Sequence, residues 1–321
     1  MNNAKKVFNE GWKFYKKGNL DAAIEAWSSI TREDDREYYA KSRLGLGLLY
    51  KKADEQEKAI EAWLSITRED NREIYAGSRL NLGLLYKEIN NQEKAIETWS
   101  NISCEDSKEA YAKSRFNLGN LYKNNGEREK AIEAWSSITR EDDREIYADS
   151  RLNLGLLYKE INNQEKAIET WSSISCEDSK EVYAKSRFNL GLLYKEINNQ
   201  EKAIETWSNI SCEDSKEVYA KSHFNLGDLY KNNNEDKKAK QCYKNVIKVG
   251  DRAFVYQANI FLRILEISSG NNKEELGELF KKIDLILGNL FVYPNRGLVD
   301  CSEVAHYTRA STALLLLEKD K

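Results

Sequence analysis

The chain has few prolines and histidines and no closely paired cysteines, and each shortage excludes a class of structure or site. Pro294 is the only proline among 321 residues, which favours long, uninterrupted helices. The five cysteines are odd in number, no two of them are separated by two residues, and His223 and His306 are the only histidines. We therefore expect neither a disulfide framework nor a metal site.

The chain also lacks an excess of charge of either sign and any long apolar run. Its 50 basic and 53 acidic residues are interspersed and leave a net charge of −3, which argues against binding to nucleic acid. No signal-like segment opens the sequence, and no apolar run approaches the roughly 20 residues that cross a bilayer. We therefore expect a soluble, cytoplasmic protein with no membrane partner. Phosphate-binding glycine loops and nucleophile motifs are absent as well, so we predict no cofactor and no catalysis by the repeats.

What the sequence does contain is a repeat. The motif AIEAW or AIETW recurs at a fixed interval of 36 residues, and Tyr243 within AKQCY continues the series. Within one period, apolar residues between Tyr111 and Tyr122 fall three or four apart, a polar turn follows at 124–127, and a second amphipathic stretch ends at Trp135. This spacing predicts two helices per period, A and B. The tryptophans of the series, which we expect in the core, are Trp27, Trp63, Trp99, Trp135, Trp171 and Trp207.

A start signal for helix A recurs between the periods. An aspartate stands three residues before a glutamate, as in Asp34 and Glu37. An acidic N-cap with glutamate three positions later can satisfy the free N–H groups at a helix start, so we predict that these aspartates are the N-caps. They are Asp34, Asp70, Asp106, Asp142, Asp178 and Asp214.

These positions resemble the tetratricopeptide signature, in which W-x2-L-G-x2-Y is followed by A-x3-F. In the second period the matching residues are Leu46, Gly47, Tyr50, Ala59 and Trp63, and the later periods match in the same way. The resemblance, which extends to Sel-like repeats, implies an all-α fold. It implies a right-handed α-solenoid of antiparallel helix pairs, in which small residues let helices approach and aromatic residues fill the spaces.

The sequence departs from the family at the slot of the leading tryptophan, which holds arginine in most periods. An arginine there should be partly buried between helices and should need an acidic partner or an aromatic face, and the nearby turn carboxylates are candidates. A ladder of arginines that recognises acidic ligands is the functional alternative. The slot residues are Arg43, Arg79, Arg115, Arg151, Arg187 and His223.

The pattern divides the chain into three parts. Residues 1–250 hold seven repeats, of which the first is an imperfect N-terminal cap. Residues 251–292 are expected to form a degenerate capping hairpin with helices at 252–267 and 272–289. Residues 293–321 are a tail of one short strand and one helix that does not fit the repeat.

This tail offers a second functional hypothesis. A strand ending in His306, Tyr307 and Thr308 before an apolar helix resembles the start of ADP-ribosyltransferase-like domains, and also the start of a family of uncharacterised bacterial domains. The resemblance implies that His306 contacts the ribose of a nicotinamide cofactor. Only 13 residues follow Thr308, so the chain would be the sensor or regulatory arm of a longer toxin or defence enzyme. The plainer interpretation is a segment that packs on the last hairpin.

The leading hypothesis places function on the concave wall that helices A line in this family. An asparagine stands one step before the packing leucine in successive periods, and its amide can bind the backbone or carboxylate of an extended peptide, although a purely structural role also fits. Two files of lysines would make the groove locally cationic. We therefore predict a protein–protein interaction scaffold, not an enzyme, that holds a peptide or protein segment of acidic or amide-rich character.

The predicted groove residues fall into three sets. The asparagines are Asn81, Asn117, Asn153, Asn189 and Asn225. The first lysine file is Lys41, Lys113, Lys185 and Lys221, and the second is Lys51, Lys87, Lys123, Lys159, Lys195 and Lys231.

Overall fold

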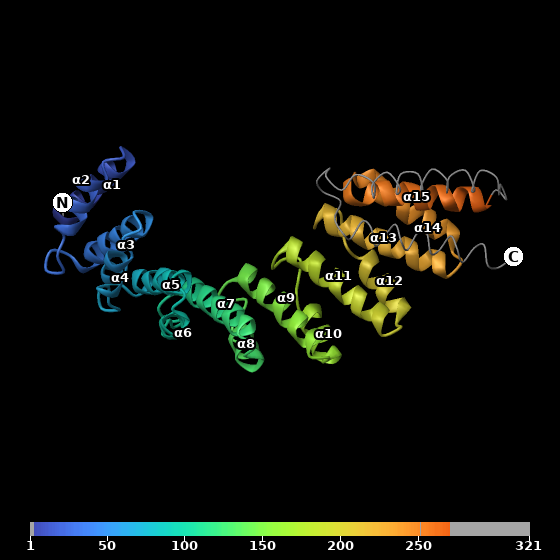
Figure 1. Ribbon diagram of the computed structural model, residues 1–321, viewed down its shortest axis with the longest axis horizontal. Helices are drawn as coiled ribbons and strands as arrows, with labels where there is room; N and C mark the ends of the chain where they lie inside the picture. Colours follow the sequence, from blue (N-terminus) through green and yellow to red (C-terminus); the bar gives the residue numbers. More distant parts are fainter. Residues whose placement is uncertain (1–2, 251, 270–321) are drawn as a thin grey trace, which may run out of the picture. The chain divides into compact units, whose positions relative to one another are not determined.

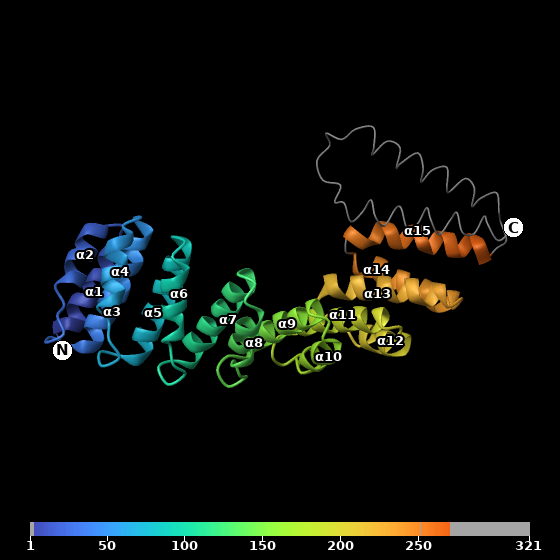
Figure 2. The same cartoon turned by 60° about the horizontal axis from the view of Figure 1, so that its bottom comes forward.

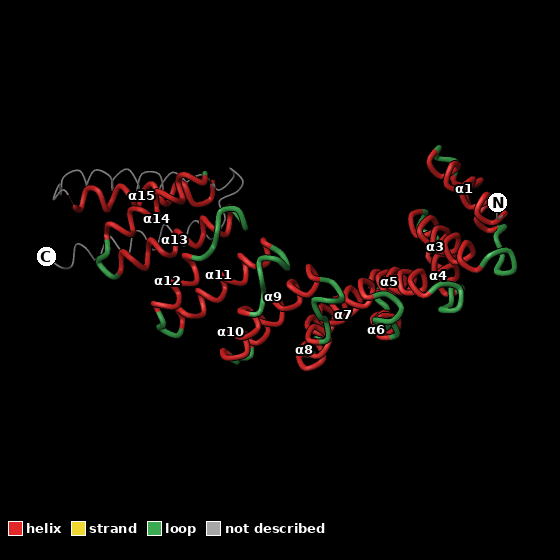
Figure 3. Tube along the Cα trace, turned by 180° about the vertical axis from the view of Figure 1, so that it is seen from behind, coloured by secondary structure: helices red, strands yellow, loops and turns green. Residues whose placement is uncertain are grey.

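A computed structural model describes residues 3–250 and 252–269, and these residues form fifteen helices and no strand. Figure 3 shows the helices joined by short loops. The A helices are α1 (Asn3–Lys16), α3 (Arg36–Lys52), α5 (Arg72–Glu88), α7 (Lys108–Asn124), α9 (Arg144–Glu160), α11 (Lys180–Glu196) and α13 (Lys216–Asn232). The B helices are α2 (Leu20–Ser28), α4 (Gln56–Leu64), α6 (Gln92–Ser100), α8 (Arg128–Ser136), α10 (Gln164–Ser172), α12 (Gln200–Ser208) and α14 (Asp236–Val249), and α15 (Arg252–Ser269) follows.

The chain divides into two compact units, residues 1–222 and 223–321, with the boundary inside α13. In the first unit each A helix from α1 to α11 packs against the B helix of its own hairpin, each from α3 to α11 also packs against the preceding B helix, and successive A helices from α1 to α11 pack against each other (Figures 1 and 2). The all-α class and the repeated helix pairs predicted from the sequence are therefore confirmed. None of the described helices is long and apolar enough to cross a membrane.

Each A helix from α3 to α11 begins one residue later than the predicted capping signal. The N-cap of α3 is Asp35, not Asp34; its backbone is extended, and its carboxylate accepts a hydrogen bond from the N–H of Tyr38 at 3.0 Å. Asp34 instead accepts from the N–H of Thr31 at 2.9 Å and closes the loop before the helix. The prediction was wrong because either residue can accept a hydrogen bond and only the backbone angles decide which one caps. The observed caps are Asp35, Asn71, Ser107, Asp143 and Ser179.

The turn from helix A to helix B contains one residue in the left-handed backbone region. This region is open to glycine and is tolerated by asparagine and aspartate. Its recurrence at the same place in every period keeps the geometry of the hairpins uniform. The residues are Gly18, Asp54, Asn90, Gly126, Asn162, Asn198 and Asn234.

The core of each hairpin is a tryptophan of helix B packed on a glycine of helix A. Trp135 is fully buried, and a Cβ added to Gly119 would overlap its indole ring. The indole of Trp99 donates a hydrogen bond to the carbonyl of Leu80 at 3.2 Å. Burial of one such side chain removes roughly 150 to 250 Å2 from water and so stabilises the fold by several kcal/mol. In the second compact unit, Tyr243 packs on Gly227 in the same way.

Some of the loops between successive hairpins are tied together by ion pairs. Nε of Arg32 lies 2.9 Å from Oδ1 of Asp70 one period later, and the guanidinium lies 4.7 Å from the centre of the Tyr39 ring. We call this arrangement the loop clamp. It recurs between Arg68 and Asp106 and between Arg140 and Asp178. In the other loops the position of the arginine is taken by Cys104, Cys176 and Cys212.

Most of the predicted C-terminal hairpin and tail lies outside the residues that the structure describes. Helix α15 covers the first of the two helices expected in the capping hairpin. The second, at 272–289, and the tail at 293–321 with His306 lie outside the residues that the structure describes. The division into repeats, capping hairpin and tail therefore stays a prediction.

Candidate functional site

The predicted asparagines lie at the seam between successive A helices. All five side chains are partly buried. The same position in α3 is Gly45, where an added Cβ would lie 3.1 Å from the ring of Trp27 in the preceding hairpin. Asn81, Asn117, Asn153 and Asn189 belong to the first compact unit, and Asn225 belongs to the second. The structure thus places the four asparagines of the first unit in one file, here called the asparagine file.

Most amides of the asparagine file have no hydrogen-bond partner among residues 3–250 and 252–269. Asn153 donates a hydrogen bond from Nδ2 to Oδ1 of Asn120 in the preceding A helix at 3.4 Å. The side-chain amides of Asn81, Asn117 and Asn189 make no hydrogen bond within the described part of the chain. A half-exposed amide offers a donor and an acceptor, so these groups can bind a peptide backbone.

An apolar file that the sequence reasoning missed runs beside the asparagines. It lies three residues further along each A helix, and residues three apart lie close together on a helix surface. Trp12 is 40% exposed and Leu48 is 49% exposed, which is unusual for large apolar side chains. The 36-residue period already aligned these positions in the sequence and could have revealed the file. Its members are Trp12, Leu48, Leu84, Leu156 and Leu192, and Asn120 takes the same position in α7.

The first lysine file is neutralised by glutamates of the same helices. Lys185 lies 2.6 Å from Glu181 one turn earlier, and the remaining members pair in the same way. In α9 the position is taken by Asp149, where burial, together with the negative charge of Glu145, raises the pKa of the carboxyl group. The pairs are Lys41 with Glu37, Lys113 with Glu109, Lys185 with Glu181 and Lys221 with Glu217.

Half of the second lysine file is paired with glutamates of the next hairpin. Nζ of Lys123 lies 2.8 Å from Oε1 of Glu160, and the same contact joins Lys51 to Glu88 and Lys159 to Glu196. In the second compact unit, Lys231 lies 5.0 Å from the centre of the Phe261 ring, and burial lowers its pKa. Lys87 and Lys195 are exposed, and no described carboxylate lies within ion-pair distance of either. The pairing removes much of the positive charge expected of the groove, which leaves Lys87 and Lys195 as its main cationic positions.

The arginines at the tryptophan slot are held by an aromatic face and by helix carbonyls. The guanidinium of Arg115 lies 4.9 Å from the centre of the Tyr111 ring. Its Nη2 donates to the carbonyls of Ser100 at 3.1 Å and Ile102 at 3.3 Å, at the C-terminal end of the preceding B helix. Carbonyls at a helix C-terminus carry partial negative charge and attract cations. Two kinds of partner were predicted for these arginines. The aromatic ring is observed beside Arg115, whereas the turn carboxylates are not its partners.

The arrangement recurs in the first compact unit. Arg43, Arg79, Arg151 and Arg187 lie between 4.6 and 4.9 Å from the tyrosine ring four residues earlier. Each of them donates to carbonyls at the end of the preceding B helix. The arginine thus connects consecutive hairpins instead of filling the core within one hairpin.

The chain is similar in sequence to known repeat families. A tetratricopeptide repeat model matches residues 112–134, 148–170, 184–206 and 220–249, and a second tetratricopeptide repeat model matches residues 8–74. A model of anaphase-promoting complex subunit 5 matches residues 65–103. No curated protein sequence matches the chain.

Solved structures of repeat proteins are similar in fold. The C-terminal part of a TPR repeat-containing protein from Cytophaga hutchinsonii superposes with a TM-score of 0.55 at 14% identity, covering 76% of this chain and 96% of that one. A tetratricopeptide repeat protein from Parabacteroides merdae gives a TM-score of 0.42 at 16% identity and coverages of 82% and 98%. YrrB, described as a TPR protein with an unusual peptide-binding site, gives 0.41 at 18% identity and coverages of 62% and 98%.

The stacked helix pairs and the repeated packing of tryptophan on glycine define an all-α helical repeat protein. The matched segments and the fold identify the family, and the chain belongs to the tetratricopeptide-like repeat proteins. It is accordingly a protein-interaction scaffold.

Proposed function

We propose that the A-helix face of residues 1–222 binds an extended segment of a partner protein. In this proposal the asparagine file contacts the backbone of the segment, and the apolar file contacts its side chains. The observation that carries the proposal is the recurrence of partly exposed amides without intramolecular partners beside exposed apolar groups such as Leu48.

The chemistry of the two files suits an extended chain. A peptide backbone presents N–H and C=O groups at regular intervals, and each needs a partner when it leaves water. An amide side chain supplies both kinds of partner, while leucines bury alternate side chains of the bound segment. Apolar burial supplies affinity, and the amides fix the direction and register of the peptide.

The charge of the partner is expected to matter at two places. Because the other lysines of the two files in residues 3–222 are paired with glutamates, Lys87 and Lys195 are the two that offer positive charge without a described carboxylate nearby. An acidic residue of the partner would interact there, and exposed charge pairs of this kind weaken as salt screens them. We therefore propose a segment with a few acidic residues, and a moderate fall in affinity as salt increases.

The test removes three amides without changing charge. The triple variant Asn117→Ala, Asn153→Ala and Asn189→Ala is compared with the wild-type chain in quantitative capture of partners from lysate, followed by affinity measurement on the strongest partner. The matched control replaces Gln92, Gln164 and Gln200 by alanine, which removes three exposed amides at the starts of α6, α10 and α12, away from the asparagine file. Circular dichroism reports whether each variant is folded.

We expect the affinity of the strongest partner to fall at least about tenfold, as lost hydrogen bonds to a desolvated backbone predict, and the control to bind as wild type does. Unchanged binding by a folded triple variant would show that the asparagine file is structural only.

A further inference from the structure

Grooves of similar construction lie between successive B helices, on the other side of the A helices from the asparagine file. One groove lies between α6 and α8 over α7 and has a volume of about 440 Å3. Equivalent residues line grooves of about 450 Å3 beside α4 and 350 Å3 beside α12. These volumes fall within the range of ligand-binding pockets. Each groove holds an arginine, two tyrosines, a leucine and a lysine in the same order, as in Tyr111, Arg115, Leu118, Tyr122 and Lys130.

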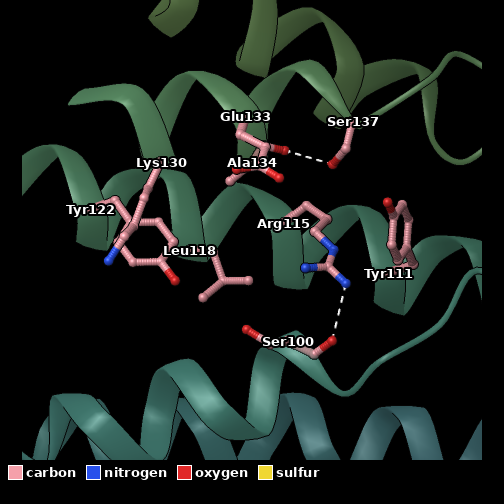
Figure 4. Close-up of a pocket in the computed structure, with 9 residues that line it drawn as sticks. All are labelled: Ser100, Tyr111, Arg115, Leu118, Tyr122, Lys130, Glu133, Ala134 and Ser137. Carbon is pink, nitrogen blue, oxygen red and sulfur yellow. Dashed lines mark hydrogen bonds between the residues drawn. The ribbon is translucent and has the colours of Figure 1, made fainter. Parts of the chain in front are cut away.

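Figure 4 shows how the groove over α7 is arranged. Arg115 lies at one end beside Tyr111, Lys130 lies at the other end beside Tyr122, and Leu118 lies between them. The Lys130 ammonium is 5.4 Å from the centre of the Tyr122 ring. The groove therefore has a cation at each end, and between them the rings of Tyr111 and Tyr122 flank Leu118, which is only 1% exposed.

The cation at the arginine end is not neutralised by a carboxylate. Arg115 donates only to backbone carbonyls, through Nη2, and its Nη1 makes no hydrogen bond within the described chain. The Nε atoms of Arg43 and Arg115 are buried without hydrogen-bond partners. Since a full positive charge faces only partial negative charges, a carboxylate at this end would be favoured.

The cation at the lysine end differs between grooves. Lys58 and Lys130 pair with Glu55 and Glu127, the residues that precede their own helices. In the groove beside α12 that position is Asn199, and no described carboxylate lies within ion-pair distance of Lys202. Each groove also has a glutamate on its rim, such as Glu133. The groove with Lys202 therefore carries the greatest excess of positive charge.

We infer that each groove binds a short acidic peptide segment in which an apolar side chain stands between two carboxylates. The apolar side chain lies against the two tyrosine rings over the buried leucine, one carboxylate meets Nη1 of the arginine, and the other meets the lysine. This surface is separate from the A-helix face, so the two sites can be occupied independently. The recurrence of the grooves allows one partner with several such segments to bind along the chain.

The probe is a fluorescein-labelled peptide with two Glu-Leu-Glu segments joined by a Gly-Ser linker, and binding to the full chain is followed by fluorescence anisotropy. Two peptides serve as ligand controls, one with Gln-Leu-Gln and one with Glu-Gly-Glu segments. The test variant is Lys130→Glu with Lys202→Glu. Its matched control is Lys6→Glu with Lys17→Glu, which makes the same change of charge at two exposed lysines of the first hairpin that line none of these grooves and belong to neither lysine file.

We expect the test variant to weaken peptide binding at least about tenfold and the matched control to leave it nearly unchanged, since short-range charge contacts are lost only in the test variant. Both control peptides should bind more weakly than the probe. Equal losses in the two variants would show nonspecific attraction, and absence of probe binding to the wild-type chain would overturn the inference. Because these lysines lie outside the asparagine file, failure here is distinguishable from failure of the A-helix site.

Discussion

Arg140 and Asp178 stand 38 residues apart in the sequence, yet Nε of the arginine lies 2.8 Å from Oδ1 of the aspartate. The aspartate side chain is only 3% exposed. The guanidinium also lies 4.6 Å from the centre of the Tyr147 ring and donates to the carbonyl of Ser173. This loop clamp therefore connects two hairpins through an ion pair, an aromatic contact and a backbone contact.

Removal of the clamp should destabilise the fold. Arg140→Ala is expected to lower the free energy of unfolding by about 1 to 2 kcal/mol, because a buried carboxylate loses its charged partner but keeps other donors. Urea denaturation followed by circular dichroism measures the change. Arg128→Ala, at an exposed position at the start of α8, is the control and should have an effect within about 0.5 kcal/mol. Equal effects of the two substitutions would contradict the role of the clamp.

The contribution of the clamp should depend on pH. Burial alone would raise the pKa of Asp178, but hydrogen bonds from Arg140 and from the N–H of Ser175 outweigh it and hold the pKa below its ordinary value. A lowered pKa means that the stabilisation is complete above the unfolded-state pKa, about 3.9, and is lost as pH falls through the lower folded-state value. The stability difference between wild type and Arg140→Ala should thus be constant from pH 7 to about 5 and should shrink towards pH 3. A difference that grows on acidification would be incompatible with this explanation.

A missing clamp can be added. Cys104 occupies the position of Arg140 one period earlier, and Asp142, Tyr111 and Ser137 stand where the partners of an arginine would be needed. Cys104→Arg should therefore raise the free energy of unfolding by about 0.5 to 1 kcal/mol. A double-mutant cycle with Asp142→Ala separates the ion pair from other effects. A coupling energy near zero would mean that the new arginine does not reach the aspartate.

Two glycines in A helices should respond to alanine in opposite ways. Gly119→Ala places a methyl group against the buried ring of Trp135, so we expect a loss of about 1 to 3 kcal/mol. Gly77 has no atom within 4 Å of an added Cβ, and alanine is the better helix former, so Gly77→Ala should stabilise by about 0.5 to 1 kcal/mol. Thermal and urea denaturation of both variants provide the comparison. Similar effects at the two sites would refute the packing argument.

The cysteines should differ in reactivity. Cys242 is buried, and burial raises the pKa of its thiol to about 11, so little reactive thiolate forms at pH 8. Cys104 and Cys176 are exposed. Iodoacetamide labelling followed by mass spectrometry should modify these two well before Cys242 in the native chain, and all three at similar rates in urea. Rapid native labelling of Cys242 would argue against its burial.

The fold could be predicted from the sequence because the 36-residue period and the sizes of the repeated residues together restrict how the helices can pack. A tryptophan repeated opposite a glycine, as with Trp135 and Gly119, is compatible with few arrangements other than two closely packed helices. The helix starts were less certain, since Asp34 and Asp35 both accept hydrogen bonds and backbone angles alone distinguish their roles. Residue type therefore predicted the existence of a cap but not its position.

The candidate sites depended more on three-dimensional detail. The pairing of Lys185 with Glu181 follows from their spacing of four residues and could have been foreseen. The pairing of Lys123 with Glu160 could not, because it depends on the offset between neighbouring hairpins. The grooves between B helices were also missed, since they arise from the short B helices and from the orientation of Arg115, neither of which has a sequence signature.

The uneven distribution of loop clamps should make opening of the first compact unit segmental. In a stack where each hairpin contacts only its neighbours, stability is a sum of local terms, and the weakest junction opens first. Clamps that start at Arg32 and Arg68 connect the early loops, whereas Cys104 and Cys176 interrupt the series further along. Amide hydrogens beside the cysteine loops should then exchange with solvent through partial openings, while clamped hairpins exchange together as cooperative blocks.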